Sequence, residues 1–96
     1  MQIIISNDAL DWFKKEMEVM HGEAVRFFVR YGGSSKLQPG FSLGVTKDQP
    51  REIGVQLERD HVVYFIEKND IWYFDEHNLE VSVNDDLHEL EYSYIK

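Results

Sequence analysis

Cysteine is absent from the 96 residues of this chain, and basic residues are few. Without cysteine the chain can form no disulfide, supply no thiolate nucleophile and offer no cysteine ligand to a metal. The 10 lysines and arginines are outnumbered by 18 aspartates and glutamates, which gives a formal net charge of −8 at pH 7. Such a surface repels phosphate backbones, and no basic stripe opposes it, so the sequence predicts no nucleic-acid partner.

Long hydrophobic runs are also missing. The opening residues, Met1 to Ser6, carry neither the basic segment nor the long apolar segment of a secretory signal peptide. The run from Val62 to Ile66 is far too short to span a bilayer. The sequence therefore predicts a soluble, cytoplasmic protein without a membrane partner.

Apolar residues are nevertheless sufficient for a core. Hydrophobic residues make up 43% of the chain and aromatic residues 14%. A chain of this length is close to the common size of one domain, so residues 1–96 are expected to fold as a single unit without a metal or a disulfide.

One amphipathic helix is predicted near the N-terminus, after a short β-branched strand at residues 3–5. Ser6, Asn7 or Asp8 can cap it, because their side-chain oxygens accept hydrogen bonds from the free amides of a first helical turn. Apolar residues recur at helical spacing at Ala9, Phe13, Met17 and Met20. Gly22 is suited to the left-handed conformation that ends a helix, so the helix is expected over residues 7–21.

Alternating apolar and polar residues predict that most of the remaining chain is strand. The strands are expected at residues 25–31, 41–46, 52–58, 61–67, 79–83 and 90–94. The strand at 61–67 is apolar on both faces, which favours a central position. Asn69 or Asp70 can cap a short helical turn near residues 69–74. The predicted fold class is α+β and mostly β.

The loop Gly32-Gly33-Ser34-Ser35 joins two of these strands. Paired glycines allow positive φ angles and close backbone approach. The loop is either a structural turn or a binding loop for an anion; the phosphate loops that bind through backbone amides usually lead into a helix, whereas a strand follows here. Ser34 or Ser35 would need a base to act as a nucleophile, and no Gly-x-Ser-x-Gly motif is present. The candidate bases are His21, His61, His77 and His88.

Two acidic turns contain histidine, and two short runs of the chain are aromatic. Carboxylate and imidazole groups in Asp75-Glu76-His77 and in Asp85-Asp86-Leu87-His88 can bind divalent metals, but they equally suit exposed turns of an acidic protein. Tyr64-Phe65 and Trp72-Tyr73-Phe74 suit core filling, with a ligand cage as the alternative. Trp12 lies off the main helical stripe, so we expect it to be exposed and to mark a protein contact.

The layout resembles a known family. A short strand, a capped helix and an arginine-bearing strand that leads into Gly32-Gly33-Ser34-Ser35 are similar to the HesB-like domain of A-type iron–sulfur carriers, the IscA-like proteins. The resemblance implies a HesB-like β-sandwich or barrel-like domain. In that family three cysteines hold iron or a cluster; Ser34 stands where the loop cysteine would be, and the C-terminal pair has no counterpart. The chain is most similar to the cysteine-free, YneR-type branch of the family.

The resemblance implies a non-enzymatic accessory or binding protein related to iron–sulfur cluster assembly, which docks on assembly partners without carrying a cluster. No catalytic, cofactor-binding or metal-binding residue is assigned, and no cofactor is expected. Gly32, Gly33, Ser34 and Ser35 form a candidate vestigial ligand loop. The alternative is a protein that binds a divalent metal through Asp75, Glu76, His77 or His88. The oligomeric state is left open.

Overall fold

The structure is a computed structural model that describes residues 1–33 and 35–96. Two helices and seven strands are assigned within these residues. They follow one another as β1 (Ile3–Ile5), α1 (Asn7–Glu16), β2 (Ala24–Tyr31), β3 (Phe41–Lys47), β4 (Ile53–Arg59), β5 (Val62–Glu67), the 3-10 helix η1 (Lys68–Phe74), β6 (Asn78–Asn84) and β7 (Glu89–Ile95).

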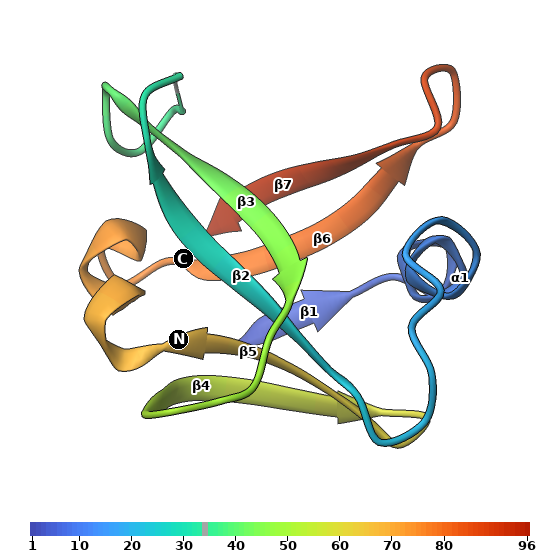
Figure 1. Ribbon diagram of the computed structural model, residues 1–96. Coiled ribbons are helices and arrows are strands. Elements are labelled where there is room, and N and C mark those ends of the chain that lie inside the picture. The colour runs from blue at the N-terminus through green and yellow to red at the C-terminus, as the bar shows by residue number, and fades with distance from the viewer. Residues whose placement is uncertain (34) are drawn as a thin grey trace.

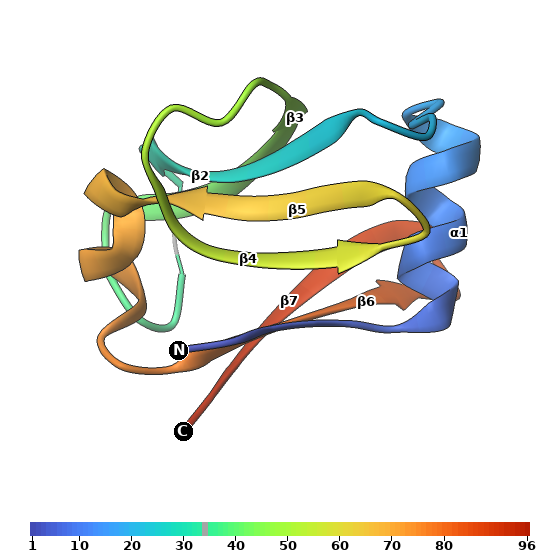
Figure 2. The same ribbon diagram turned by 90° about the horizontal axis from the view of Figure 1, so that it is seen from below.

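The strands form two mixed sheets. The larger sheet has the order β3-β2-β5-β4, in which β2 and β5 are parallel and the other pairs antiparallel. The smaller sheet has the order β1-β6-β7, in which β1 is parallel to β6. Helix α1 lies at one end of the two sheets and η1 at the opposite end (Figures 1 and 2). The prediction of a mostly β fold with one N-terminal helix and a helical turn near residues 69–74 is confirmed, as is the internal position of β5.

Both sheets and α1 contribute to one hydrophobic cluster. Ser6 caps α1, since its Oγ accepts a hydrogen bond from the Ala9 amide at 3.1 Å. Phe13 then extends from the buried face of the helix and meets the rings of Phe27 and Tyr64 at 6.0 and 5.2 Å between centroids. The apolar periodicity of the helix therefore places its Phe13 side chain against the larger sheet.

Helix α1 ends at Glu16 rather than at residue 21. Glu18 adopts a φ of 53°, which turns the chain, and Val19 becomes buried while its amide donates to the Phe13 carbonyl at 3.3 Å. Met20, expected on the buried stripe, is 68% exposed. The prediction of a helix to residue 21 is therefore wrong: the apolar spacing continues, but the burial of Val19 requires the chain to leave the helix early.

Gly22 does not end the helix. It has a φ of 89°, and its amide donates to the His61 carbonyl at 2.8 Å. The glycine therefore joins the segment after α1 to the turn between β4 and β5.

Asp70 connects η1 to the larger sheet instead of capping a helix. The residue at the N-cap of η1 is Glu67, and no side chain caps it. One carboxylate oxygen of Asp70 accepts from the Val29 amide and from Arg26 Nη2, each at 3.3 Å. Arg26 Nη1 also reaches Asp48 at 3.5 Å, while its buried Nε has no hydrogen-bond partner in the described part of the chain. Asp70 therefore anchors η1 to β2.

No helix in the described ranges is long and apolar enough to cross a membrane.

Candidate functional site

The loop between β2 and β3 is closed by backbone contacts at its base. Tyr31 pairs with Phe41, and the Gly32 amide donates to the Gly40 carbonyl at 2.8 Å. Gly32 and Gly33 have φ values of 107° and 72°. A Cβ atom at Gly33 would lie 3.0 Å from Ser42 Oγ. Both glycines adopt the positive φ that the sequence allows, and Gly33 also lies close to a side chain of β3. The expectation that this is a vestigial ligand loop stays a prediction.

Of the two serines of the loop, the structure describes only Ser35. Ser34 lies outside the described residues. Ser35 Oγ accepts hydrogen bonds from the amides of Leu37 and Gln38, at 3.3 and 3.1 Å. Within residues 1–33 and 35–96, no imidazole or carboxylate forms a hydrogen bond with the Ser35 hydroxyl, so the base that a serine nucleophile needs is not bonded to it.

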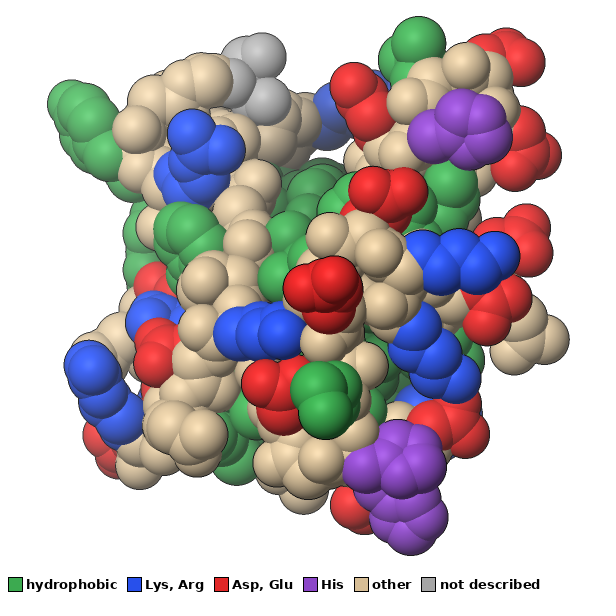
Figure 3. All heavy atoms as spheres, turned by 45° about the vertical axis from the view of Figure 1, so that its right-hand side comes forward, with side chains coloured by type: hydrophobic (Ala, Val, Ile, Leu, Met, Phe, Trp, Pro, Cys, Tyr) green, Lys and Arg blue, Asp and Glu red, His purple; other side chains and the backbone are tan. Residues whose placement is uncertain are grey.

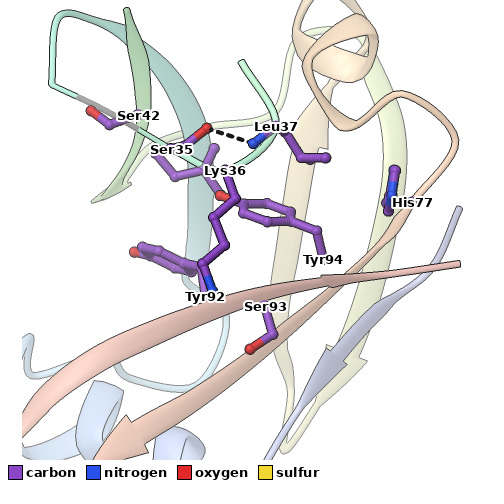
Figure 4. Close-up of a pocket in the computed structure, with 9 residues that line it drawn as sticks. Ser35, Lys36, Leu37, Ser42, His77, Tyr92, Ser93 and Tyr94 are labelled. Carbon is purple, nitrogen blue, oxygen red and sulfur yellow. Dashed lines mark hydrogen bonds between the residues drawn. The ribbon is translucent and has the colours of Figure 1, made fainter. Parts of the chain in front are cut away.

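A cavity of about 560 Å³ opens beneath this loop, between β3 and the C-terminal part of β7 (Figure 4). We call it the loop pocket. It is lined by Ser35, Lys36, Leu37, Ser42, Leu43, His77, Tyr92, Ser93 and Tyr94. The side chain of Lys36 extends from the loop toward β7 (Figure 4). The loop and β7 are far apart in the sequence, so the pocket is created by the packing of the two sheets.

The tyrosines of the loop pocket remain neutral at physiological pH. Burial raises the pKa of Tyr92 to about 12. Burial also raises the pKa of Tyr94, with a further contribution from the 3.0 Å hydrogen bond between its hydroxyl and that of Tyr73. The aromatic walls of the loop pocket therefore add no negative charge to it.

His77 reaches the loop pocket from a strained turn. Asp75 and Glu76 have φ values of 46° and 65°, in a backbone region that residues other than glycine rarely adopt. The His77 Nδ1 lies 2.9 Å from the carbonyl oxygens of both Phe74 and Asp75. Because carbonyl oxygens only accept, Nδ1 is the donor in these contacts.

The residues considered for a metal do not come together. His77 precedes β6, whereas His88 lies in the turn after it, where its carbonyl accepts the Trp12 indole hydrogen bond at 2.8 Å. The other two histidines, His21 and His61, lie apart from both: their rings are 5.2 Å from each other and tilted by 53°, near the turn between β4 and β5. In the described ranges, no three histidine, aspartate or glutamate side chains are close enough to share a metal ion.

An exposed group of aromatic rings lies at the base of the loop. Tyr31 is 94% exposed and Trp72 is 52% exposed. The rings of Tyr31 and Phe41 meet edge to face at 5.7 Å, and those of Phe41 and Trp72 at 5.3 Å. We call these three residues the aromatic surface.

The aromatic predictions are partly confirmed. Tyr73 and Phe74 are fully buried, as are Tyr64 and Phe65, so core filling is right for these four. Trp12, expected to be exposed, is half-buried and packs against the core, because its indole is held by the turn between β6 and β7. The strongly exposed tryptophan is Trp72.

Charge is unevenly distributed along the fold. Residues 24–47, which form β2, the loop and β3, contain Arg26, Arg30, Lys36 and Lys47 and no aspartate or glutamate. Residues 69–95 contain eight acidic residues and no lysine or arginine. Figure 3 shows acidic side chains at the tip of the β6–β7 hairpin and, interspersed with lysines, over α1. The hairpin that carries the loop is therefore the basic part of an acidic molecule.

Comparison with known proteins identifies relatives along the whole chain. A protein named pyruvate dehydrogenase inhibitor, from Bacillus subtilis (strain 168), is 52% identical over 94 residues, which cover 98% of this chain and 99% of the relative. Two relatives named only as uncharacterized proteins come from Staphylococcus saprophyticus and Staphylococcus aureus (strain MRSA252). They are 44% and 41% identical, over 97% and 100% of this chain and 98% and 99% of their own. The chain belongs to the family of these bacterial proteins.

Membership of this family corrects the expected resemblance to the HesB-like domain. No family model matches the chain, and no solved structure matches it. The Bacillus subtilis relative is named for inhibition of pyruvate dehydrogenase and not for iron–sulfur assembly. The predicted accessory role in iron–sulfur cluster assembly, together with the assembly partners that it implied, is therefore wrong.

The aromatic surface was not found from the sequence, and although a binding role was considered for the glycine loop, the residues of β7 that line the loop pocket were not connected with it. Alternation placed Tyr31 on a strand and Tyr92 and Tyr94 on another, which is right, but it gave no sign that the loop covers β7. The absence of acidic residues from 24 to 47 was a usable signal, because it marks a surface distinct from the rest of the chain.

Proposed function

We propose that this chain is a non-enzymatic regulatory protein that binds pyruvate dehydrogenase and inhibits it. The observation that carries the proposal is the 52% identity to the Bacillus subtilis inhibitor over 98% of this chain. Similarity at this level along nearly the full length of both chains supports a common fold and common surface features. A regulatory role is also consistent with the hydrogen bonding of Ser35. Its hydroxyl oxygen accepts hydrogen bonds from two backbone amides and forms none with a base among the described residues.

The aromatic surface is the contact that we propose for the enzyme. Tryptophan and tyrosine are the residues on which binding energy at protein interfaces is concentrated. Here each ring of the aromatic surface is held by an edge-to-face neighbour, at 5.7 and 5.3 Å. Rings that are already held in place lose less conformational entropy when a partner covers them.

Arg30 adds a positive charge to the hairpin that carries Tyr31 and Phe41, on the opposite face of the strand from Tyr31. It precedes Tyr31 on β2 and is exposed, and its Cδ packs over Gly44, where an added Cβ would lie 2.7 Å away. The surrounding hairpin carries no carboxylate between residues 24 and 47. A basic hairpin suits an acidic region of the partner, which would be attracted to it although the overall charge of the chain is −8.

The test measures NADH formation from pyruvate by the Bacillus subtilis pyruvate dehydrogenase complex in the presence of the purified chain. The chain is expected to inhibit the reaction and to bind the complex in a pull-down or by calorimetry. Trp72→Ala and Tyr31→Ala are expected to weaken inhibition by about 30-fold or more each, the effect of losing a central interface aromatic. Arg30→Glu is expected to weaken it through charge repulsion, with a larger effect at low salt.

Matched controls come from exposed apolar residues elsewhere on the molecule. Met20 and Leu87 are 68% and 64% exposed and lie outside the aromatic surface. Met20→Ala and Leu87→Ala are expected to inhibit like the unaltered chain. Failure of the unaltered chain to bind or inhibit the enzyme would refute the proposed function. Inhibition that persists equally in the aromatic and control variants would refute the contact surface alone.

A further inference from the structure

We infer that the loop pocket binds a small organic anion whose body is aromatic or otherwise apolar. The inference goes beyond the proposed function, because the ligand would bind to this chain by itself. It rests on the charge, the walls and the size of the pocket.

The charge of the lining is opposite in sign to that of the molecule. None of the nine lining residues is an aspartate or a glutamate, although the chain contains 18 of them. Lys36 brings an ammonium group, and within the described residues it forms no ion pair. Tyr92 stays protonated, because burial raises its pKa to about 12. A carboxylate or phosphate that enters the pocket therefore meets one positive charge and no negative one.

One hydroxyl group, that of Ser35, lies on the loop side of the same space. Ser42 and Ser93 line its edges, but their hydroxyls point away from the rings of Tyr92 and Tyr94 (Figure 4). The hydroxyl of Ser42 already donates to the Gly32 carbonyl at 3.2 Å, so this serine holds the loop in place. Ser93 lies on the exposed face of β7, opposite to the face that carries Tyr92 and Tyr94, so its backbone rather than its hydroxyl borders the pocket. Hydrogen bonds from neutral donors supplement a charged contact and help to orient an anion.

The walls are apolar. Leu37 lies on the side of the loop and the rings of Tyr92 and Tyr94 on the side of β7 (Figure 4). Leu43 lines the pocket from β3. A cavity of about 560 Å³ is in the range of small-molecule sites, which typically combine apolar walls with a few polar groups. A planar ring of six atoms fits between such walls, with its anionic substituent directed toward Lys36.

The experiment uses three commercial compounds of similar shape and an NMR titration of the ¹⁵N-labelled chain. Benzoate presents a carboxylate, phenyl phosphate a phosphate ester, and benzamide a neutral group of nearly the same size as benzoate. Benzoate or phenyl phosphate is expected to shift the amide resonances of Leu37, Leu43 and Ser93. Benzamide is expected to bind about 10-fold more weakly, the effect of losing a charge-assisted contact.

The variant Lys36→Gln isolates the charge. It is expected to reduce the affinity for the anions to that for benzamide and to leave the affinity for benzamide unchanged. Lys15→Gln is the matched control, because Lys15 is an exposed lysine of α1 and its substitution changes the net charge by the same amount. A preference for benzoate over phenyl phosphate, or the reverse, would identify the anionic group.

Three results would overturn the inference. The first is equal affinity for benzamide and benzoate. The second is the absence of shifts at the named amides with either anion, or shifts confined to other surfaces. The third is equal anion binding by Lys36→Gln and Lys15→Gln, which would show that only net charge matters.

Discussion

Asp70 is expected to hold the end of the molecule that carries Trp72. Replacing it with alanine removes two contacts of one carboxylate oxygen, to Arg26 Nη2 and to the Val29 amide, each of 3.3 Å. Both partners of the ion pair are shielded from water, since the side chains of Arg26 and Asp70 are 25% and 16% exposed. Arg26 would keep only Asp48, at 3.5 Å, and its Nε already has no partner among the described atoms.

The magnitude follows from these two losses. A hydrogen bond to a charged group contributes about 1.5–3 kcal/mol, and an amide left without an acceptor costs about 1 kcal/mol more. Asp70→Ala is therefore expected to lower the free energy of unfolding by about 3 kcal/mol. For a chain of this length, that corresponds to a decrease in Tm of roughly 12–24 °C. Asp70→Asn keeps an acceptor for the Val29 amide, so it is expected to cost about half as much.

Urea denaturation measures the effect, and tryptophan fluorescence reports it from both ends of the molecule, through Trp12 on α1 and Trp72 on η1. Asp60→Asn is the control, because Asp60 pairs with Lys14 at the exposed surface. The reasoning is refuted if Asp70→Ala unfolds at the same urea concentration as Asp60→Asn. It is also refuted if Asp70→Asn destabilises the protein as much as Asp70→Ala.

Three further predictions concern the core, the loop and alkaline pH. Phe13→Ala is expected to lower the free energy of unfolding by about 3–5 kcal/mol, because the ring is fully buried, and urea denaturation checks this. Gly33→Ala is expected to lower the free energy of unfolding by about 1–2 kcal/mol through backbone strain at its φ of 72°, and further through the close contact of the new Cβ with Ser42. Gly32→Ala has the backbone strain but open space for a Cβ, so thermal melts of the two variants separate the two effects. Burial raises the pKa of Tyr92 from 10.0 to about 12, so the unfolded state ionises first. Stability is therefore present below pH 10 and decreases between about pH 10 and pH 12, and Tyr92→Phe should reduce that decrease when urea midpoints are compared across the interval.

Local sequence patterns were sufficient to predict the helix and the strands, but not how these elements pack against one another. The strands and the helix start depend on residues that are adjacent in the sequence, such as the Ser6 cap and the alternation on either side of Gly32-Gly33. The helix end depends on the burial of Val19, and the exposure of Trp72 depends on how η1 is anchored by Asp70. These are tertiary effects, which override helical periodicity and aromatic composition.

The resemblance to iron–sulfur carriers failed for a related reason. It was based mainly on a strand followed by Gly32-Gly33, and two positive-φ glycines are what a tight loop requires whatever it binds. The residues that would have made the resemblance specific are thiolates, and the chain contains none. The loop geometry therefore supported a fold element and not a function.

The pairing of β1 with β6 has a consequence for how the chain reaches this fold. The amide of Gln2 donates to the side chain of Asn78, and the indole of Trp12 to the carbonyl of His88, and each bond spans 76 positions. During synthesis the isoleucines of β1 have no strand to pair with until β6 has left the ribosome. Completion of the smaller sheet is thus a late event in folding, and the emerging Ile3–Ile5 segment is where we expect a chaperone to bind or misassembly to begin.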